Sequence, residues 1–338
     1  MIKPKKRIAV AILNYNGINH LKKFLPSVVK YSDKKISELY VIDNNSNDES
    51  VNFIRKNYPS VNIIQNKKNY GYAKGYNIGL SQIDLKYLVL LNNDVKVSEN
   101  WLKPMYLGLE EDKDIGSCQP KILSFEKKNY FEYAGASGGY LDFLYYPFCR
   151  GRIFNHVEKD EGQYNSSKEI FWSSGACFMI RNKLFKELGG FDESFFAHME
   201  EIDLCWRIKG LNFSNYCFPD SKVYHLGGGT LKYENPKKTY LNFRNNLIMI
   251  LKNESRFKLL FKLPVRFLFD LFASLFLLIS KKSITHFMSV LKAYIYIIIR
   301  IPYFLFNNRN LIKRKSFEDE IIIPIKYYLL GKKRYSDL

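Results

Sequence analysis

The chain has 338 residues, of which 46% are hydrophobic, so it can bury one large core or two modest ones. Its five cysteines form no C-x-x-C pair, which argues against a disulfide framework and a zinc site and favours a reducing compartment. The net charge is +19, and residues 251–338 hold 17 Lys and Arg against 6 Asp and Glu. Such basic surface suits nucleic acid, anionic lipid or phosphorylated substrates, or is simply solvated.

The chain opens with a basic segment before an apolar run, "MIKPKKRIAVAILNYNG". The run is about seven residues long and lacks a small-residue cleavage site, so we expect a first strand rather than an export signal. Apolar runs at 7–13, 39–43, 61–65 and 87–91 are mostly continuous, as in strands covered on both faces. Helical patterns lie between them, and this alternation predicts a parallel α/β sheet.

Polar residues stand at the ends of three of these runs. Asn14 and Tyr15 follow the first run, Asp43 closes the second, and Asp94 follows the run at 87–91. In parallel α/β sheets, ligands bind beyond the carboxyl ends of the strands. We therefore expect these residues at one edge of the sheet, where they would form a binding site. For Asp43 alone, an Asx turn or a helix cap is the alternative.

The second half of the chain changes character. Segments 171–181 and 215–226 predict further strands, and 193–210 predicts an amphipathic helix preceded by an acidic, aromatic loop. Pro236 begins another helical pattern, and residues 256–306 form an apolar stretch interrupted by basic residues.

Seven motifs in this order resemble the family 2 glycosyltransferases, which have the GT-A fold. The motifs are "AILNYNG" (11–17), "VIDNNSNDES" (41–50), "NYGYAKGYNIG" (69–79), "LNNDV" (91–95), "SSGACFMIR" (173–181), "GGFDESFFAHMEEIDLCWR" (189–207) and "VYHLGG" (223–228). The resemblance covers roughly residues 5–250 and favours the rhamnosyltransferase-like group of bacterial surface-polysaccharide synthesis. It implies a GT-A catalytic domain over residues 1–250, a mostly parallel sheet flanked by helices, followed by a helical tail over 251–338.

The resemblance implies an inverting, metal-dependent transfer of a hexosyl or rhamnosyl group. The donor would be a UDP- or dTDP-sugar, and the acceptor a glycan or a polyprenyl-diphosphate-linked saccharide. Asp94 matches the last acidic position of the family's D-x-D motif, which binds Mn²⁺ or Mg²⁺. Asn92 stands at the first position, so one negative charge is missing and metal affinity should be modest. His225 matches a second metal ligand, although a lone histidine after a strand is often structural.

The donor nucleotide is expected against further matched positions. Asp43 matches the residue that hydrogen-bonds the base, and Tyr15 would stack on it. Gly71, Gly75 and Gly79 recur every fourth residue and predict a smooth helix face that packs closely on the sheet. The remaining donor-binding candidates are Asn14, Asn69, Lys74, Asn92, Asn93 and Arg244. For Lys74, a solvated role is the alternative.

The acceptor needs a general base within hydrogen-bond reach of its attacking hydroxyl. Glu201 matches the family's base, where an Asp is usual, and Glu200 is the second candidate. Adjacent helical side chains point about 100° apart, so the two do not share one role. Trp172 is expected either to stack on the acceptor sugar or to pack in the core, and His198 is expected on the acceptor side.

Asp203 and Arg207 are spaced to form a salt bridge along the helix. For the whole acidic segment that contains Glu200 and Glu201, the alternative is a charged, solvated helix face.

The tail predicts contact with a membrane. Lys258, Lys262, Arg266 and Asp270 recur every four residues, so one helix face is polar. This pattern fits helices in the membrane interface with their basic residues toward anionic headgroups, at the inner face of the cell membrane. A spanning hairpin of 267–280 and 284–301, or packing against the catalytic domain, are the alternatives.

Two other functions remain open from the residues. A nucleic-acid-binding protein would use the positive charge, but no recognisable binding module is present, so we expect no nucleic acid partner. An inactive, lectin-like scaffold on the same fold is conceivable because Asn92 and Glu201 depart from the usual residues.

Overall fold

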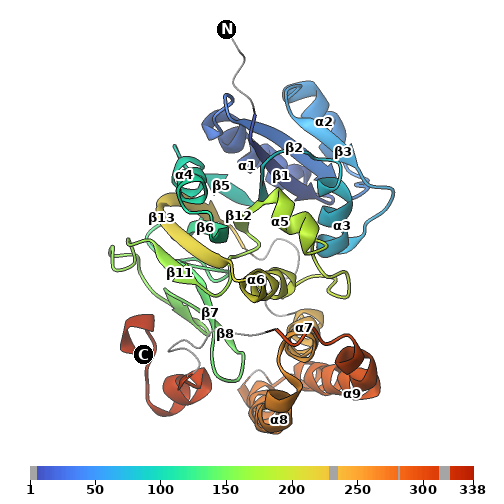
Figure 1. Cartoon of the computed structure of the whole chain (residues 1–338), viewed down its shortest axis with the longest axis vertical. Helices are drawn as coiled ribbons and strands as arrows, with labels where there is room; N and C mark the ends of the chain where they lie inside the picture. Colours follow the sequence, from blue (N-terminus) through green and yellow to red (C-terminus); the bar gives the residue numbers. More distant parts are fainter. Residues whose placement is uncertain (1–5, 228–234, 281, 312–319) are drawn as a thin grey trace.

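The computed structural model describes residues 6–227, 235–280, 282–311 and 320–338. In its first part, parallel strands alternate with helices, as predicted (Figure 1). The elements are β1 (Ile8–Asn14), α1 (Ile18–Tyr31), β2 (Ser37–Asp43), α2 (Ser50–Asn57), β3 (Asn62–Gln65), α3 (Gly71–Leu80) and β4 (Tyr87–Asn92). Strand β1 pairs in parallel with both β2 and β4, and β2 pairs in parallel with β3.

The sheet continues with strands of mixed direction. These elements are β5 (Val95–Val97), α4 (Lys103–Glu111), β6 (Ile115–Ser124), β11 (Lys168–Ile170), β12 (Cys177–Arg181), α5 (Asn182–Glu187), α6 (Glu200–Gly210) and β13 (Ser214–His225). The strand order is β11-β13-β6-β12-β4-β1-β2-β3, and β5 pairs with β13. Strand β12 is antiparallel to both neighbours, whereas β13 is parallel to β6. The strand predicted from residue 171 begins only at Cys177, because the preceding Ser-Ser-Gly segment turns.

Apolar side chains fill both faces of this sheet. One core contains Val10, Val89 and Trp101, and the other contains Ala11, Leu90 and Phe178. Successive strand residues point to opposite faces, so a continuous apolar run is what a strand covered on both faces requires. The glycine face of α3 makes the close contacts that were predicted. A Cβ on Gly79 would lie 2.5 Å from Ile42 Cδ1, and one on Gly75 would lie 2.7 Å from Asn44 Nδ2.

A small antiparallel sheet lies beside the main one. It is formed by β7 (Gly139–Leu141), β8 (Pro147–Cys149), β9 (Arg152–Ile153) and β10 (His156–Val157). The C-terminal segment returns to this sheet (Figure 1). Ile321 and Ile323 join the apolar cluster of the sheet, and Tyr335 stacks on Tyr140. The tail is therefore anchored at both ends, by helices on one side and by this segment on the other.

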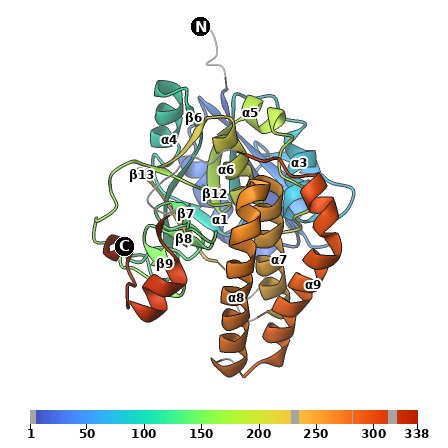
Figure 2. The same ribbon diagram turned by 60° about the horizontal axis from the view of Figure 1, so that its bottom comes forward.

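Three helices lie side by side below the main sheet: α7 (Pro236–Asn253), α8 (Arg256–Ser280) and α9 (Ile284–Phe306) (Figure 2). Asn235 caps α7 by accepting a hydrogen bond from the Lys237 amide at 2.9 Å, and Pro236 takes the first helical position. Residues of α7, α8 and α9 share one apolar cluster with Trp206 of α6. The predicted boundary at residue 250 falls inside α7 and stays a prediction.

The polar face of α8 faces the protein rather than the membrane interface that the sequence predicted. Lys262 donates to the Phe143 carbonyl at 2.8 Å, and Arg266 donates to the Leu144 carbonyl at 2.6 Å. Arg266 also pairs with Asp270 at 3.0 Å, and both side chains are buried. The prediction that Lys262 and Arg266 face lipid headgroups is wrong, because they bond the backbone carbonyls of Phe143 and Leu144 instead. Of the four polar positions, Lys258 remains exposed.

Large apolar side chains cover the opposite side of the α8–α9 hairpin. Residues more than half exposed are Phe257, Leu260, Phe261, Leu268, Phe272, Phe276, Ile279, Ile284, Ile295, Ile298, Ile299, Tyr303 and Phe306. By length and composition alone, both helices are long and apolar enough to cross a membrane. Helix α8 starts before the predicted span 267–280 and ends with it, and α9 starts with the predicted span 284–301 and ends after it.

Candidate active site

The carboxyl ends of β1 and β2 form a closed polar network. Asn14 is paired with Asp43 in the register of the two strands, and its Nδ2 donates to Asp43 Oδ1 at 3.3 Å. Ser46 donates to the same carboxylate from its amide at 2.9 Å and from its hydroxyl at 2.6 Å. Asp43 thus stabilises a local turn through the amide three residues on, rather than the amide two residues on that defines an Asx turn, and is only 1% exposed. Its contact with a nucleotide base stays a prediction, as does stacking by Tyr15, which is 46% exposed.

The turn after β4 packs directly on this network. Asn92 lies opposite Leu13 of β1, and Asn93 Nδ2 donates to Asn14 Oδ1 at 3.0 Å. Gly17 makes this approach possible, because a Cβ there would lie 2.3 Å from both Asn14 Oδ1 and Asn93 Nδ2. The edge predicted from the strand ends is confirmed. Sequence reasoning missed His20 of α1, whose Nδ1 lies 3.3 Å from Asn93 Oδ1.

Asp94 and His225 meet at this edge although 131 positions separate them. Strand β5 pairs with the end of β13, which places His225 opposite Val95, and His225 Nε2 lies 3.1 Å from Asp94 Oδ1. On its other side, His225 Nδ1 lies 3.2 Å from Glu132 Oε2, an ion pair rather than a well-aligned hydrogen bond. All three side chains are buried. Nothing in the sequence singled out Glu132, because it belongs to a loop without a motif.

Electrostatics within this trio favour a charged imidazole between two carboxylates. Burial opposes that charge, yet Glu132 and Asp94 together raise the pKa of His225 to about 10. Burial likewise works against ionised Asp94, but the neighbouring His225 holds the pKa of that carboxyl below its usual value. Burying these three charged side chains costs stability, and such clusters are typical of sites where a bound ligand interacts with the charges.

A divalent cation fits between Asp94 and His225 once Nε2 has released its proton, because a metal-binding imidazole is neutral. Ligands of an octahedral ion lie about 2.1 Å from the metal, so neighbouring ligand atoms are about 3 Å apart. The distance between Asp94 Oδ1 and His225 Nε2 matches that spacing. Glu132 on the far nitrogen orients the imidazole, as carboxylates beside metal-binding histidines commonly do. Among the described residues no group of three or more acidic, His or Cys side chains forms a complete metal site. Further ligands would have to come from diphosphate and water.

The two glutamates at the start of α6 differ in accessibility. Glu200 is 4% exposed, whereas Glu201 is partly exposed. In both, Oε2 is buried without a hydrogen-bond partner in the described chain. Burial raises the pKa of both carboxyls, and the charge of Glu201 raises that of Glu200 further. An acceptor can reach Glu201 more readily, so the structure favours it over Glu200 as the base.

Glu201 lies close to the strand-end edge. The backbone amide of Gly175 hydrogen-bonds its carboxylate, and the Gly175 carbonyl accepts from the Tyr72 hydroxyl at 2.8 Å. The next residue, Ala176, accepts from the Asn92 amide at 3.0 Å. One short turn therefore connects the candidate base with the end of β4. The predicted Asp203–Arg207 salt bridge is confirmed, at 2.8 Å.

Asn245 links the backbone of His198 to the side chain of Arg244. Asn245 Nδ2 donates to the His198 carbonyl, and Arg244 Nε donates to Asn245 Oδ1, both at 2.8 Å. The Arg244 guanidinium lies over the rings of Tyr240 and Tyr296, with Nη2 buried and unpaired in the described chain. Burial, aided by nearby Lys238, lowers the pKa of His198 to about 4, so its imidazole is neutral at pH 7. The roles of Arg244 at the diphosphate and of His198 at the acceptor stay predictions.

Three other candidates take part in local structure. Trp172 is 4% exposed, its indole donates to the Tyr140 carbonyl at 3.0 Å, and its ring lies against Gly139. The prediction that Trp172 stacks on an acceptor sugar is wrong, because the ring belongs to the core. Asn69 Oδ1 accepts from the Gly71 amide at 2.9 Å and so begins α3. Lys74 forms an exposed ion pair with Glu193 at 2.6 Å, which fits its solvated alternative.

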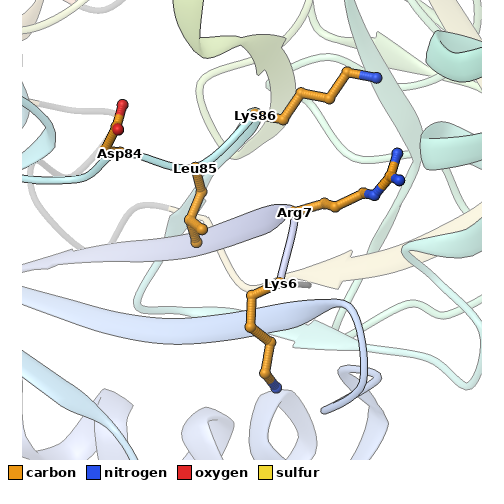
Figure 3. Close-up of a pocket in the computed structure, with 5 residues that line it drawn as sticks. All are labelled: Lys6, Arg7, Asp84, Leu85 and Lys86. Carbon is orange, nitrogen blue, oxygen red and sulfur yellow. The ribbon is translucent and has the colours of Figure 1, made fainter. Parts of the chain in front are cut away.

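An open surface depression lies at the opposite edge of the sheet (Figure 3). It is lined by Lys6, Arg7, Asp84, Leu85 and Lys86, which precede β1 and β4. These residues stand at the amino ends of the strands, far from the Asp94 edge along each strand, and Lys86 already pairs with Glu110. The depression plays no part in the candidate site.

Comparison with known proteins identifies the family. Residues 9–189, more than half of the chain, match the model of glycosyl transferase family 2. The chain belongs to this family. It is a glycosyltransferase of the rhamnosyltransferase-like type and catalyses sugar transfer in glycan biosynthesis.

This family 2 glycosyltransferase is similar to several relatives over more than half of its length. The low-salt glycan biosynthesis hexosyltransferase Agl10 of Haloferax volcanii is 22% identical over 249 residues, 71% of this chain and 74% of that protein. The N-acetylglucosaminyl-diphospho-decaprenol L-rhamnosyltransferase of Mycobacterium tuberculosis is 23% identical over 232 residues, 64% of this chain and 75% of that protein. Rhamnosyltransferase WbbL of Escherichia coli is 22% identical over 208 residues, 60% of this chain and 76% of that protein.

Solved structures confirm the GT-A fold. GalNAc-T7 with UDP, GalNAc and Mn²⁺ superposes with a TM-score of 0.59 at 19% identity, covering 75% of this chain but only 49% of that one. The mannosyltransferase PcManGT from Pyrobaculum calidifontis, in complex with GDP-Man and Mn²⁺, gives a TM-score of 0.51 at 13% identity and covers 90% of this chain and 74% of that one.

Proposed function

We propose that this glycosyltransferase transfers a hexosyl or rhamnosyl group from a UDP- or dTDP-sugar to a glycan or a polyprenyl-diphosphate-linked saccharide, with inversion at the anomeric carbon. The observation that carries the proposal is the Asp94–His225 pair at the carboxyl edge of the sheet, with 3.1 Å between its two ligand atoms. The cations and nucleotides named with the two solved structures support a nucleotide-sugar donor and a divalent cation.

Each residue at the edge has a task in this reaction. A bound Mn²⁺ or Mg²⁺ would supply positive charge to the diphosphate as it leaves. Asp94 and His225 would hold that ion, and Glu132 would keep the imidazole turned toward it. Asn92 offers an amide where the family usually has a carboxylate, so it can hydrogen-bond the donor but adds no negative charge.

Glu201 acts on the acceptor side. Its carboxylate takes the proton from the acceptor hydroxyl as that oxygen attacks the anomeric carbon, and the bond from this carbon to the diphosphate oxygen breaks with both electrons on the diphosphate. Burial raises the pKa of Glu201, which makes its carboxylate a stronger base than a solvated one. Tyr15, half exposed beside Asn14, and the Asp43 turn provide the surface for the nucleotide base.

A donor screen tests this proposal. Purified chain is incubated with UDP-, dTDP- and GDP-sugars and Mn²⁺, with and without short glycan acceptors, and nucleoside diphosphate release is measured. We expect release that requires both Mn²⁺ and one donor class. No release with any donor, together with retained nucleotide-sugar binding, would instead support an inactive scaffold on the same fold.

The α8–α9 hairpin supports attachment of this enzyme to the cytoplasmic face of the cell membrane. Helix α8 keeps Lys262, Arg266 and Asp270 against the protein and shows Phe272 and Phe276 to the outside. A helix on the surface of a water-soluble protein has the reverse polarity. An exposed apolar surface of this size marks an interaction site, and acyl chains match its chemistry.

Vesicle sedimentation tests this attachment. The wild-type chain should pellet with phosphatidylcholine vesicles and more strongly with phosphatidylglycerol vesicles, because of its positive charge. The double variant Phe272→Asp/Phe276→Asp should remain in the supernatant. Leu107→Asp on α4 is the matched control, because Leu107 is also exposed (40%) but lies away from the hairpin. Equal pelleting of all three proteins would contradict the assignment.

A further inference from the structure

The backbone that leads into α6 has an unusual conformation. His198 and Met199 have φ angles of 71° and 74°, so two consecutive residues with side chains adopt the left-handed region. This region is unfavourable for residues other than glycine, and such conformations persist only where surrounding contacts impose them. No side chain caps the N-terminus of α6. The turn that precedes Glu200 and Glu201 must therefore be held from outside the helix.

Asn245 of α7 supplies that hold. Its Nδ2 donates to the Ala197 carbonyl and to the His198 carbonyl, both at 2.8 Å, and the side chain is fully buried. Its Oδ1 accepts from Arg244 Nε at 2.8 Å. Because the guanidinium can only donate, this bond fixes which end of the amide faces the turn. Both amide hydrogens of Asn245 are thus committed to consecutive carbonyls of the strained turn.

We propose that Asn245 is a positioning residue for the acceptor-side base, and that Arg244 acts by orienting it. Asn245 holds the 197–199 turn, the turn sets the start of α6, and the start of α6 aims the Glu201 carboxylate at the acceptor hydroxyl. This inference rests on the proposed role of Glu201. It gives Arg244 a function through its Nε that is separate from any contact with the leaving diphosphate.

The adjacent Asn246 provides a matched control. It is equally buried on the same helix, but its Nδ2 donates to the Tyr145 carbonyl at 3.0 Å, away from the turn. Asn245→Leu and Asn246→Leu each replace a buried amide by an apolar group of similar shape. Both should lower thermal stability, Asn245→Leu by more, because it leaves three partners unpaired whereas Asn246→Leu leaves one. The Ala variants of both residues replace them if a Leu variant does not fold.

The kinetic test separates positioning from general structure. For Asn245→Leu we expect kcat to fall about 100-fold with donor KM within about twofold, because small misplacements of a catalytic group are costly while the Asp94 edge is untouched. For Asn246→Leu we expect kcat within about threefold of wild type. In a Glu201→Gln background, Asn245→Leu should cost little more, since the two residues act through one group. Equal kcat losses for the two Leu variants, or full additivity with Glu201→Gln, would overturn the proposal.

Hydrogen exchange gives a readout that does not need activity. Peptides covering residues 195–204 should exchange faster in Asn245→Leu than in wild type and remain protected in Asn246→Leu. If the wild-type chain transfers no sugar, the proposed function fails, but this exchange difference still shows whether Asn245 holds the turn. No difference between the variants would refute that hold directly.

Discussion

The two sides of the candidate site satisfy their polar groups in opposite ways. On the donor side, Asn14, Asp43, Ser46 and Asn93 bind one another at the strand ends. Around the start of α6 and at neighbouring Arg244, polar atoms are buried without partners in the described chain: Glu200 Oε2, Glu201 Oε2, His198 Nε2 and Arg244 Nη2.

This difference indicates that the two regions have different roles. The network of Asn14, Asp43, Ser46 and Asn93 is held before any ligand arrives, which favours rigid binding of the proposed nucleotide. The acceptor side keeps polar groups in unfavourable surroundings, and buried groups without partners cost stability until something pairs with them. Catalytic carboxyl groups with raised pKa values are found in such surroundings.

Asp94→Ala should lower transfer turnover about 1,000-fold, because the variant loses a group that holds the ion at the diphosphate; removing one stabiliser of developing charge costs about 10²–10³. The measurement is nucleoside diphosphate release at saturating donor and Mn²⁺. Asp94→Asn serves as the isosteric control and should lose nearly as much activity while melting near the wild-type temperature. Unchanged turnover in Asp94→Ala would remove Asp94 from the metal site.

Glu201→Gln should lower kcat about 100-fold or more, since general base catalysis contributes about 10²–10⁴. Donor affinity, measured by calorimetry with a nucleotide sugar, should stay the same because the donor side is intact. Glu200→Gln is the paired control and should retain most of the turnover. The reverse ranking of the two variants would make Glu200 the base.

Transfer by the wild-type chain should depend on pH through the same carboxyl. Burial raises the pKa of Glu201, so the base is protonated, and inactive, at pH values where a solvated Glu with a pKa of about 4.3 is still ionised. The rate should fall about tenfold per pH unit below the raised pKa and level off above it. A kcat profile from pH 5 to 9 measures this. A profile with its inflection at or below the solvated value would contradict a buried base.

Glu132→Gln should weaken Mn²⁺ binding about tenfold, because carboxylates behind metal-binding histidines contribute about 10–100-fold to affinity. Gln can still accept from the Ala134 amide, as Glu132 does at 2.6 Å, so the local turn should survive. Electron paramagnetic resonance of free Mn²⁺ gives the affinity without an activity assay. Glu158→Gln is the matched control, because Glu158 is equally buried but bonds Tyr164. Identical affinities in both variants would rule out an orienting role.

Glu200→Gln should stabilise the fold by about 1 kcal/mol at pH 7, because an amide carries no charge that burial disfavours. The pKa of Glu200 is raised by burial, so the wild-type carboxyl stabilises the fold most below about pH 4.3 and loses that contribution as pH rises toward its raised value. The stability gain of the variant should therefore shrink on acidification. Urea unfolding at pH 7 and pH 4.5 tests this sign, and a gain that grows at pH 4.5 would contradict it.

The sequence predicted the features that depend on strand patterns and on family motifs. Continuous apolar runs located β1, β2 and β4, and the register of parallel strands then required Asn14 and Asp43 to meet. The pairing of Asp94 with His225 followed from the family resemblance, because nothing local joins positions so far apart. Glu132 and Asn245 could not be found this way, since a loop carboxylate and a helical amide gain their roles only through tertiary contacts.

Two errors have a common physical source. An aromatic residue beside a turn suits a sugar platform and a core equally, and only the approach of Gly139 shows that Trp172 is buried. The spacing of Lys262, Arg266 and Asp270 correctly placed them on one face of α8. Periodicity does not say whether that face meets solvent or protein, and the backbone carbonyls that decide it lie over a hundred residues earlier in the chain.

The ion pair between Arg266 and Asp270 also constrains where α8 lies relative to the rest of the protein. Tyr146 and Tyr294 both donate to Asp270, and Arg266 bonds the Leu144 carbonyl, so α8 is fastened to the body through charges that hydrocarbon would not tolerate bare. A hinge between hairpin and body would expose them. If the hairpin binds a lipid surface as proposed, the protein sets the distance between that surface and the candidate site, and a lipid-linked acceptor must span this distance with its own spacer.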